Sequence, residues 1–440
     1  MMRAIARYGV RSIPGDEKAI VDAFRRGEAI EGPAIAEYEN RFADYHRMRH
    51  AVTASFGRMA FYYLLRALDL PPKSEVILPA LTFWVVPEIA RRAGLQPVFV
   101  DVDAKTFNIN PTAIAAAITE QTRVIVPTHL YGQPCEMTEI MRIAEKHNLI
   151  VIEDCAQAAG ATYRGRKVGT FGAASFFSFQ LLKGINTYGG GMALTNDSAI
   201  AESVSARAKA EPPQNTADLI RRFALGLVAR SLVSPKAFTY WGFPVGSVLS
   251  VMGNYDLSKY FWEPIRPLDQ FPAVYRQRYS NVQAIIGLRA LDKLDEFNAR
   301  SRHHARIFTN GLADCRSIQT PKTIADAEHV YYQYCIYISD PNRAKRRAIR
   351  RAVDFETTHV DVCSSLPIFR NFAVDCPGAE QTREALQLPV YARLRESDVK
   401  RILRVVREVA SDFTPLEFKS VAPSSKEEFL NREKSHACTN

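Results

Sequence analysis

The stretch LIVIEDCAQAAGATYRGRKVGTFGAASFFSFQLLKGINTYGGGMALTND, Leu149–Asp197, carries the pattern from which the fold is predicted. It contains three short hydrophobic runs, Leu149–Glu153, Ala174–Phe177 and Met192–Thr195. Such runs, with little polar alternation, are typical of strands that are buried on both faces of a sheet. We therefore predict a strand at each run.

Further strands are predicted upstream of this stretch, at Glu75–Leu78, Pro97–Val100 and Val124–Pro127, with helical stretches between them. Strands that alternate with helices along the chain form a mostly parallel sheet with helices on both sides. The residues before about Met48 have helical apolar spacing. The fold class is therefore α/β.

The 440 residues are enough for a large domain and a smaller one. We predict a large domain with N-terminal helices over 1–210 and an inserted apolar and basic segment over 211–270. A long helix over 280–308 and a small α+β domain would follow within 271–420. In that domain we expect a strand at 331–338 and helices at 342–353 and 397–413. A polar tail over 421–440 would be disordered.

The acidic pair Glu153-Asp154 stands at the end of one predicted strand. In an open parallel sheet, residues just past the carboxyl ends of the strands face the ligand crevice. A carboxylate there suits the ring nitrogen of pyridoxal phosphate (PLP), whose protonated ring withdraws electrons. Gln157 would reach the phenolic oxygen of the same ring. The alternative is that Asp154 only caps the next helix.

Lys183 follows the next predicted strand, 29 residues after Asp154, and precedes the triplet Gly189-Gly190-Gly191. Burial in this apolar setting would lower its pKa and supply the neutral amine that a covalent bond to an aldehyde requires. Ser178 is a candidate phosphate ligand, and the glycines would let the backbone pass close to a bound group. The alternative is an ordinary surface lysine in a turn.

Two other segments are candidates for the same site. In ASFGRMAFYYLLRAL, Ala54–Leu68, a turn opens into an amphipathic helix whose N-terminus, at Gly57 and Arg58, would attract a phosphate. Phe83 or Trp84, after a strand, would stack on a pyridine ring. Taken alone, the first segment is better interpreted as a capped helix without a ligand, and each aromatic residue is more often part of the core.

Taken together, these segments resemble the DegT/StrS-type sugar aminotransferases, PLP enzymes of the aspartate-aminotransferase fold (fold type I). The resemblance begins at Arg25–His46 and covers most of the chain. It continues through residues 74–111 and QTRVIVPTHLYGQP, EDCAQAAG, SFQLLKGINTYGGG, VQAIIGLRALDKLDEFNARSR and LQLPVY. It implies a seven-stranded type of sheet and a homodimer with active sites at the subunit interface. The implied reaction transfers an amino group, usually from glutamate, to a keto-sugar that is usually nucleotide-linked.

The resemblance also implies a role for each candidate residue. Lys183 would hold PLP as a Schiff base, and Asp154 would pair with the ring nitrogen. Gln157 would contact the ring, and Phe83 would stack on it. The phosphate would be held by Ser178, Gly57 and Arg58. No metal is implied.

Two positions depart from the family pattern at the phosphate. The family usually has G-T-x-A-L where this chain has Gly57-Arg58-Met59-Ala60-Phe61, so that a guanidinium replaces a hydroxyl and can still bind phosphate. The asparagine that the family takes from the partner subunit is replaced by Arg276. Both arginines are therefore candidate cofactor ligands.

The segment from Pro212 to Phe271 is longer than the family usually has at this place. Ala237–Gly253 is free of charge over 17 residues but contains Pro244 and three glycines, which suits a membrane span poorly. One hypothesis is that residues 219–253 contact a membrane peripherally, while nearby arginines bind anionic headgroups. The substrate of the enzyme would then be lipid-linked. The favoured alternative is a cover over the active site or an enlarged dimer interface.

The composition narrows the partners and the compartment. The net charge of +10 favours anionic partners, but no basic stripe with interleaved aromatics predicts nucleic-acid binding. Seven cysteines, an odd number without a C-x-x-C, are typical of free thiols and not of a zinc site. No apolar run of signal-peptide length stands at the N-terminus, so we expect a cytoplasmic protein.

Other functions are weaker interpretations. A dehydratase on the same fold resembles this chain but has histidine where Lys183 stands. A non-enzymatic regulator would fit the altered phosphate motif but not the pair Asp154 and Lys183. A plain nucleotide-binding protein lacks a G-x-G-x-x-G or P-loop motif here.

Overall fold

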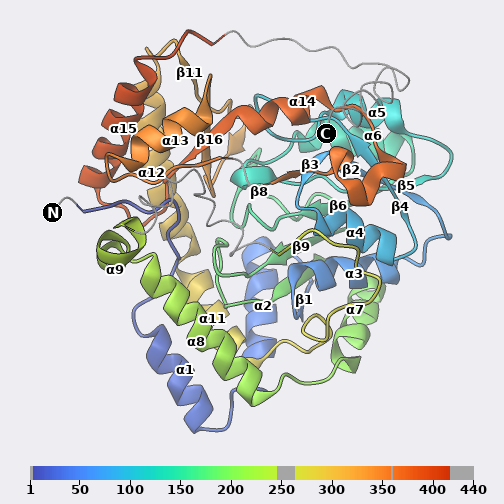
Figure 1. Ribbon diagram of the computed structural model, residues 1–440. Helices are drawn as coiled ribbons and strands as arrows, with labels where there is room; N and C mark the ends of the chain where they lie inside the picture. Colours follow the sequence, from blue (N-terminus) through green and yellow to red (C-terminus); the bar gives the residue numbers. More distant parts are fainter. Residues whose placement is uncertain (1–2, 245–262, 358–359, 417–440) are drawn as a thin grey trace.

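The computed structural model describes residues 3–244, 263–357 and 360–416 (Figure 1). Its largest sheet has seven strands in the order β1-β10-β9-β6-β5-β2-β4. These are β1 (His50–Ala54), β2 (Glu75–Pro79), β4 (Gln96–Val100), β5 (Thr122–Ile125), β6 (Ile150–Asp154), β9 (Ala174–Ser178) and β10 (Gly191–Thr195). The α/β fold and the predicted strands are confirmed, with shifts of one or two residues at their ends.

Only β10 runs against the other strands of this sheet. It pairs antiparallel with both β9 and β1, whereas β9, β6, β5, β2 and β4 pair in parallel. Strand β1 was not among the predicted strands, since its short sequence HAVTA has no apolar run. The parallel order places the carboxyl ends of β6 and β9 side by side.

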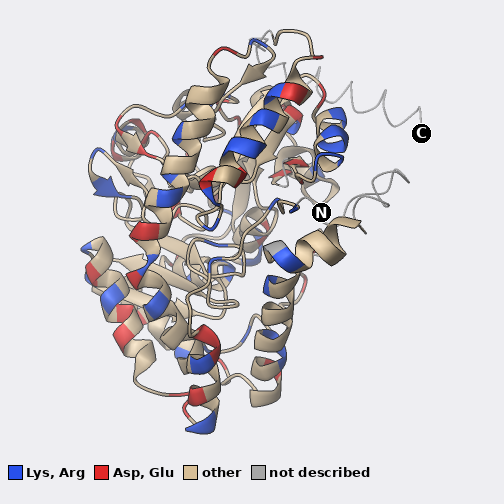
Figure 2. Ribbon diagram, turned by 90° about the vertical axis from the view of Figure 1, so that its left-hand side faces the viewer, with Lys and Arg blue, Asp and Glu red and all other residues tan. Residues whose placement is uncertain are grey.

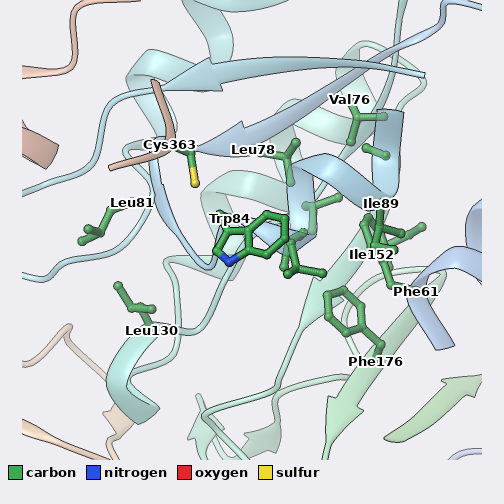
Figure 3. Close-up of a cluster of buried hydrophobic side chains, with 14 of the residues drawn as sticks. Phe61, Val76, Leu78, Leu81, Trp84, Ile89, Leu130, Ile152, Phe176 and Cys363 are labelled. Atoms are coloured by element: carbon green, nitrogen blue, oxygen red, sulfur yellow. The ribbon is translucent and has the colours of Figure 1, made fainter. Parts of the chain in front are cut away.

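Helices cover both faces of this sheet. On one face lie α3 (Gly57–Ala67), α4 (Val85–Arg92) and α7 (Ser198–Ala210), and Figure 3 shows Phe61, Trp84 and Phe176 packed in the core between helices and sheet. On the other face lie α2 (Ala34–His46), α5 (Pro111–Ala117), α6 (Met137–Lys146) and α11 (Asn281–Asp292). Because side chains alternate along a strand, Phe176 points to the first face and Phe177 to the second.

A second core belongs to the C-terminal part of the chain. Its four-stranded sheet has the order β11-β13-β16-β14, with β11 (Ile318–Gln319), β13 (Tyr334–Ile338), β14 (Glu356–Thr357) and β16 (Ala385–Leu388). It packs against α12 (Leu294–Leu312), α13 (Pro341–Ile349) and α15 (Glu396–Ala410). The predicted elements at 331–338, 342–353 and 397–413 are present but shorter.

The long helix predicted over 280–308 is two helices, α11 and α12, that meet at Lys293. The two helices serve different cores. α11 packs on α2 in the large domain, where Gly287 lies against the ring of Tyr38. α12 packs on the small sheet through Ala305, Phe308 and Leu312. The apolar periodicity is continuous across the break, so the sequence does not reveal it.

The inserted segment contains a helix that the sequence did not predict, α8 (Thr216–Leu232), followed by α9 (Pro235–Ala237) and the π-helical turn η2 (Phe238–Gly242). The Asn215 side chain caps α8 by accepting from the amide of Ala217 at 2.8 Å. Leu219 and Phe223 are buried against α1 (Asp16–Arg25) and Tyr188. Residues 245–253 of the uncharged run, and the predicted tail, lie outside the described residues.

The remaining elements are short. One small sheet has the strand order β12-β7-β8, with β12 (Ala327–Glu328), β7 (Thr162–Tyr163) and β8 (Arg166–Lys167). Another pairs β15 (Asp361–Val362) with β3 (Leu81–Thr82). The short helices are η1 (Leu130–Gly132), η4 (Cys363–Ser365), η5 (Pro367–Phe372), α14 (Pro377–Gln381) and η6 (Thr382–Glu384). Within the described ranges, no helix combines the length and the apolar character that a membrane crossing requires.

Candidate active site

A cavity of about 390 Å³ opens at the carboxyl ends of β6 and β9. Of the predicted site residues, Gly57, Arg58, Phe83, Asp154, Gln157, Ser178 and Lys183 line it, and Arg276 does not. These residues come from four separate segments of the chain, at 57–58, 83, 154–157 and 178–183. The fold therefore brings together all but one of them, while their roles stay predictions.

Lys183 lies in the turn after β9, where its amide donates to the Gln180 carbonyl at 2.9 Å. Its side chain is half-buried, and Nζ lies 5.1 Å from the ring centre of Tyr332. The pKa of Lys183 is lowered to about 8, chiefly by burial; the Asp154 charge opposes this shift and the Arg58 charge adds to it. A substantial fraction of this amine is therefore neutral, and so nucleophilic, near pH 8.

Asp154, the last residue of β6, is buried at the base of the cavity. Burial raises its pKa, while the Ala156 amide, Lys183, His129 and the Thr128 hydroxyl act in the opposite direction. The Ala156 amide donates to Oδ1 at 3.0 Å, so Asp154 also caps the following turn. Capping and ligand binding are compatible here, because the carboxylate has a second oxygen.

A buried network that the sequence did not predict lies behind Asp154. Glu153 accepts from the amides of Gly169, Phe171 and Gly172 at 2.7 to 2.9 Å. His129 Nε2 lies 3.0 Å from Glu153 Oε2, and His129 Nδ1 accepts from the Cys135 amide at 3.0 Å. Because Nδ1 accepts, the proton must be on Nε2, which donates to Glu153.

His129, Glu153 and Cys155 form a group of potential metal ligands, with ligand atoms within 4.8 Å of one another. The hydrogen bonds of the same network account for their closeness. The lone pair of His129 Nδ1 is taken by an amide, and both oxygens of Glu153 already accept hydrogen bonds. The group therefore has a structural role: it fixes the loop after β5 against the end of β6.

The N-terminus of α3 forms the opposite end of the cavity. No side chain caps this helix, whose N-cap residue is Phe56. A Cβ at Gly57 would lie 2.7 Å from the Phe177 carbonyl oxygen and 3.0 Å from Ser178 Cβ, so only glycine allows α3 to begin this close to β9. The Ser178 side chain and the first amides of α3 therefore line the same end of the cavity, where an anion is favoured.

Arg58 is already engaged by two residues that sequence reasoning missed. Its guanidinium contacts the Glu263 carboxylate and the Tyr275 hydroxyl, and that hydroxyl also contacts Glu263. The guanidinium carbon lies 4.7 Å from the ring centre of Tyr275. Tyr275 directly precedes Arg276, the position that departs from the family pattern, whereas nothing in the sequence indicated Glu263, 205 positions from Arg58.

Phe83 and Gln157 line the middle of the cavity. Gln157 Oε1 accepts from the Tyr131 amide at 2.9 Å, so the amide nitrogen of its side chain is the group that can donate to a ligand. The ring of Phe83 forms part of the wall, 5.7 Å from the guanidinium carbon of Arg58. Trp84, the other aromatic candidate, is buried in the core instead.

Arg276 and the glycines that follow Lys183 were expected near the cofactor, and neither lines the cavity of this chain. Arg276 is 61% exposed in its side chain and pairs with Glu211 at 3.1 Å, outside the cavity of its own chain. The resemblance assigns this position to the site of a second subunit, so its role stays a prediction. Gly190 and Gly191 do not line the cavity but pack against Tyr279 and the start of α3.

Arg11 is another residue near the site that the sequence did not predict. It is half-buried, and the loss of hydration lowers its pKa to about 10; it donates to the Gly184 carbonyl at 3.2 Å and to the Asn298 side chain at 2.9 Å. It therefore ties the turn that carries Lys183 to α12. The N-terminal segment around it carried no motif of its own.

A family model described as the DegT/DnrJ/EryC1/StrS aminotransferase family matches residues 13–407. The chain is 30% identical to a GDP-perosamine synthase of Caulobacter vibrioides over 390 residues, 86% of this chain and 90% of the relative. It is 32% identical to a UDP-N-acetyl-3-dehydro-alpha-D-glucosamine 3-aminotransferase of Acidithiobacillus ferrooxidans, over 84% and 86% of the two chains. The solved structure of an aminotransferase from Psychrobacter cryohalolentis matches with a TM-score of 0.74 and 26% identity, covering 92% of this chain and 98% of the other.

Proposed function

The chain belongs to the DegT/DnrJ/EryC1/StrS aminotransferase family and is a PLP-dependent aminotransferase, and we propose that it moves an amino group from glutamate to the ketone of a nucleotide-linked sugar. Two relatives whose names contain GDP and UDP support this substrate class. The single observation that carries the proposal is the position of the Lys183 amine and the Asp154 carboxylate in one cavity.

The residues of the cavity fit PLP. Bound PLP would supply an aldehyde and an electron-withdrawing ring, the two features that amino transfer requires. The buried carboxylate of Asp154 would hold the positive charge of a ring nitrogen, and the Gln157 amide would donate to the phenolic oxygen. Phe83 would stack on the ring.

The phosphate end of the cavity fits a dianion. Ser178 would donate its hydroxyl, and the first amides of α3 at Gly57 would donate along the helix axis. Arg58 would bind the phosphate once its contact with Glu263 is exchanged. The inserted segment therefore reaches the cofactor site through Glu263.

Lys183 would bind the cofactor covalently through Nζ and would then carry protons during the transfer. Its lowered pKa suits both tasks, because Nζ must act as a nucleophile when neutral and as an acid when protonated. Asp154 and Arg58 set this pKa in opposite directions. Arg11 would keep the amine in place by holding the Gly184 carbonyl.

We further propose that two copies form a homodimer in which Arg276 of each subunit lies near the phosphate site of the other. Arg276 is exposed and does not line the cavity of its own chain, which leaves it available to a second subunit. In such a dimer each active site is built from both chains.

The assignment of Lys183 is tested by trapping the cofactor. The purified protein with PLP should show an absorbance band that glutamate bleaches. Borohydride reduction followed by peptide mapping should then place the cofactor on Lys183, and Lys183→Ala should give neither the band nor the labelled peptide. A labelled peptide from any other position would refute the assignment.

A further inference from the structure

Helix α8 has apolar residues on two opposite faces. Leu219 and Phe223 on its inner face are buried against α1 and Tyr188. Ile220, Leu225, Val228 and Leu232 on its outer face are 51% to 61% exposed. A helix that is apolar all round is normally covered on both sides, so the outer face is a contact surface.

Two aromatic residues extend this surface beyond the C-terminal end of α8. Tyr240 and Trp241, in the turn η2, are 63% and 72% exposed, while their neighbour Phe238 is buried. We call these two residues, with the four apolar residues of the outer face of α8, the apolar patch. Exposed Trp and Tyr beside an apolar helix face are typical of the boundary between lipid and water.

The apolar patch is bordered by positive charge. Arg221 and Lys236 are exposed on α8 and α9. Phe238 packs on Ala352, which connects η2 to the end of α13. There Arg346 and Arg350 are exposed, and no acidic partner lies within salt-bridge distance of them among the described residues. Figure 1 shows α9 between the end of α8 and α13, and Figure 2 shows how rich in Lys and Arg that region is.

We propose that the apolar patch and its border of cations bind the surface of a bilayer that contains anionic lipids. The apolar side chains would enter the boundary between headgroups and acyl chains, and the cations would meet the headgroup phosphates. The contact lies on the surface of one leaflet, since the described helices include none that could cross the bilayer.

The charges around the apolar patch favour an anionic lipid surface over a second copy of the chain as its binding partner. In a two-fold contact the same surface of both copies would meet, which would bring the same cations together. Beside Arg346 and Arg350, the acidic residues Asp412 and Glu408 already have partners, because Asp412 pairs with Arg347 and Glu408 with Arg351. Asp218 is the only acidic residue of α8. An anionic surface complements this border, whereas a copy of it does not.

Vesicle co-sedimentation of the full chain tests the proposal. The wild type should pellet with vesicles of phosphatidylcholine and phosphatidylglycerol, and less with phosphatidylcholine alone. The variant Leu225→Ser/Val228→Ser/Trp241→Ser should bind the anionic vesicles about tenfold more weakly or worse. Arg346→Gln/Arg350→Gln should weaken binding similarly. Binding of the wild type should fall at about 1 M salt, where the Debye length is about 3 Å.

Matched controls separate the patch from general effects. Val21→Ser removes an exposed apolar residue of α1, and Arg142→Gln/Lys146→Gln removes two cations of α6, which lies on another side of the molecule (Figure 1). Both should bind vesicles like the wild type. Aminotransferase activity should be unchanged in every variant, because none of these residues lines the cavity.

Analytical ultracentrifugation of the same variants tests whether a second copy of the chain covers the apolar patch instead. If the apolar triple variant changes from dimer to monomer, the patch is an interface between copies and the proposal is wrong. Wild-type protein that does not pellet with either kind of vesicle would also overturn it. Should the triple variant misfold by circular dichroism, the charge variant alone decides, since its exposed arginines make no contact that the fold requires.

Discussion

At the scale of single residues, the site depends on how neighbouring charges set the state of Lys183. The lysine is half-buried and its pKa is about 8, lower than the usual value because of burial. Asp154 is the charge that raises this pKa and Arg58 is one that lowers it. Each of these neighbours would also touch PLP, so cofactor binding and lysine reactivity are coupled.

The pH dependence of cofactor attachment follows from this coupling. The neutral amine is the reactive form, so the rate of covalent PLP binding should rise with pH, with a midpoint at about pH 8 and a plateau above it. Asp154→Asn removes a charge that favours the ammonium form and should move the midpoint to lower pH. The rate is measured by stopped-flow absorbance from about pH 6 to about pH 9.5, a range that includes the midpoint and the plateau. A midpoint that moves upward in the variant would contradict the mechanism.

Glu263 gives a second prediction at this scale. Its carboxylate contacts Arg58 where the phosphate would bind, so it competes with the phosphate for the guanidinium. Glu263→Gln should lower the Kd for PLP by about five- to tenfold, equivalent to roughly 1 kcal/mol. PLP titration followed by fluorescence gives this Kd.

A double-mutant cycle provides the control for Glu263. In the background of Arg58→Met the Glu263 substitution should have little effect, because the group for which it competes is gone. Weaker PLP binding by the Glu263 single variant would mean that the carboxylate orients Arg58 for the phosphate and does not compete with it.

At the scale of elements, the start of α3 has the tightest constraint of the site. Gly57 lies against the backbone of β9, and a Cβ there would meet the Phe177 carbonyl oxygen at 2.7 Å. Backbone cannot move aside as a flexible side chain can. The helix N-terminus can therefore lie this close to the strand end only because Gly57 has no side chain.

Gly57→Ala should reduce the free energy of unfolding by about 1–3 kcal/mol and weaken PLP binding, because α3 must shift away from Ser178. Urea denaturation of the apoprotein measures the first effect. Gly184→Ala is the matched control: the nearest atom to its added Cβ would lie 3.6 Å away, and its φ is not positive. Equal stability of the two variants would show that α3 adjusts without strain.

The elements also show where local patterns mislead. α11 and α12 share one apolar periodicity, yet they pack in different cores and separate at Lys293. α8 was not predicted because its apolar residues surround the helix, so that no single apolar face stands out. In both cases the elements against which a helix packs, and not its own sequence pattern, determine where it ends and which face it buries.

At the scale of the whole molecule, the proposed dimer predicts complementation between inactive subunits. Lys183→Ala loses the amine of its own site, and Arg276→Ala weakens the site of its partner. In a mixed dimer one site combines both defects and the other has neither. Random mixing makes half of the dimers mixed, so activity should recover to about a quarter of the wild type.

The mixture is prepared by co-expression with two different affinity tags and assayed by glutamate-dependent amination of a nucleotide-linked keto-sugar. Each variant alone is the baseline. Recovery no greater than the sum of the two baselines would place Arg276 outside the partner's site and refute the shared-site arrangement.

The residues alone were sufficient for six of the seven strands of the large sheet and for most of the cavity. Buried parallel strands leave short continuous runs of Val, Ile and Phe, and ligands bind where such strands end, so Asp154 and Lys183 could be located by position. The contact of Arg58 with Glu263 and Tyr275, the network of His129 and Glu153, and the exposed outer face of α8 required the folded chain. The physical reason is that strand and motif signals lie within a few neighbouring residues, whereas these contacts join segments that only packing brings together.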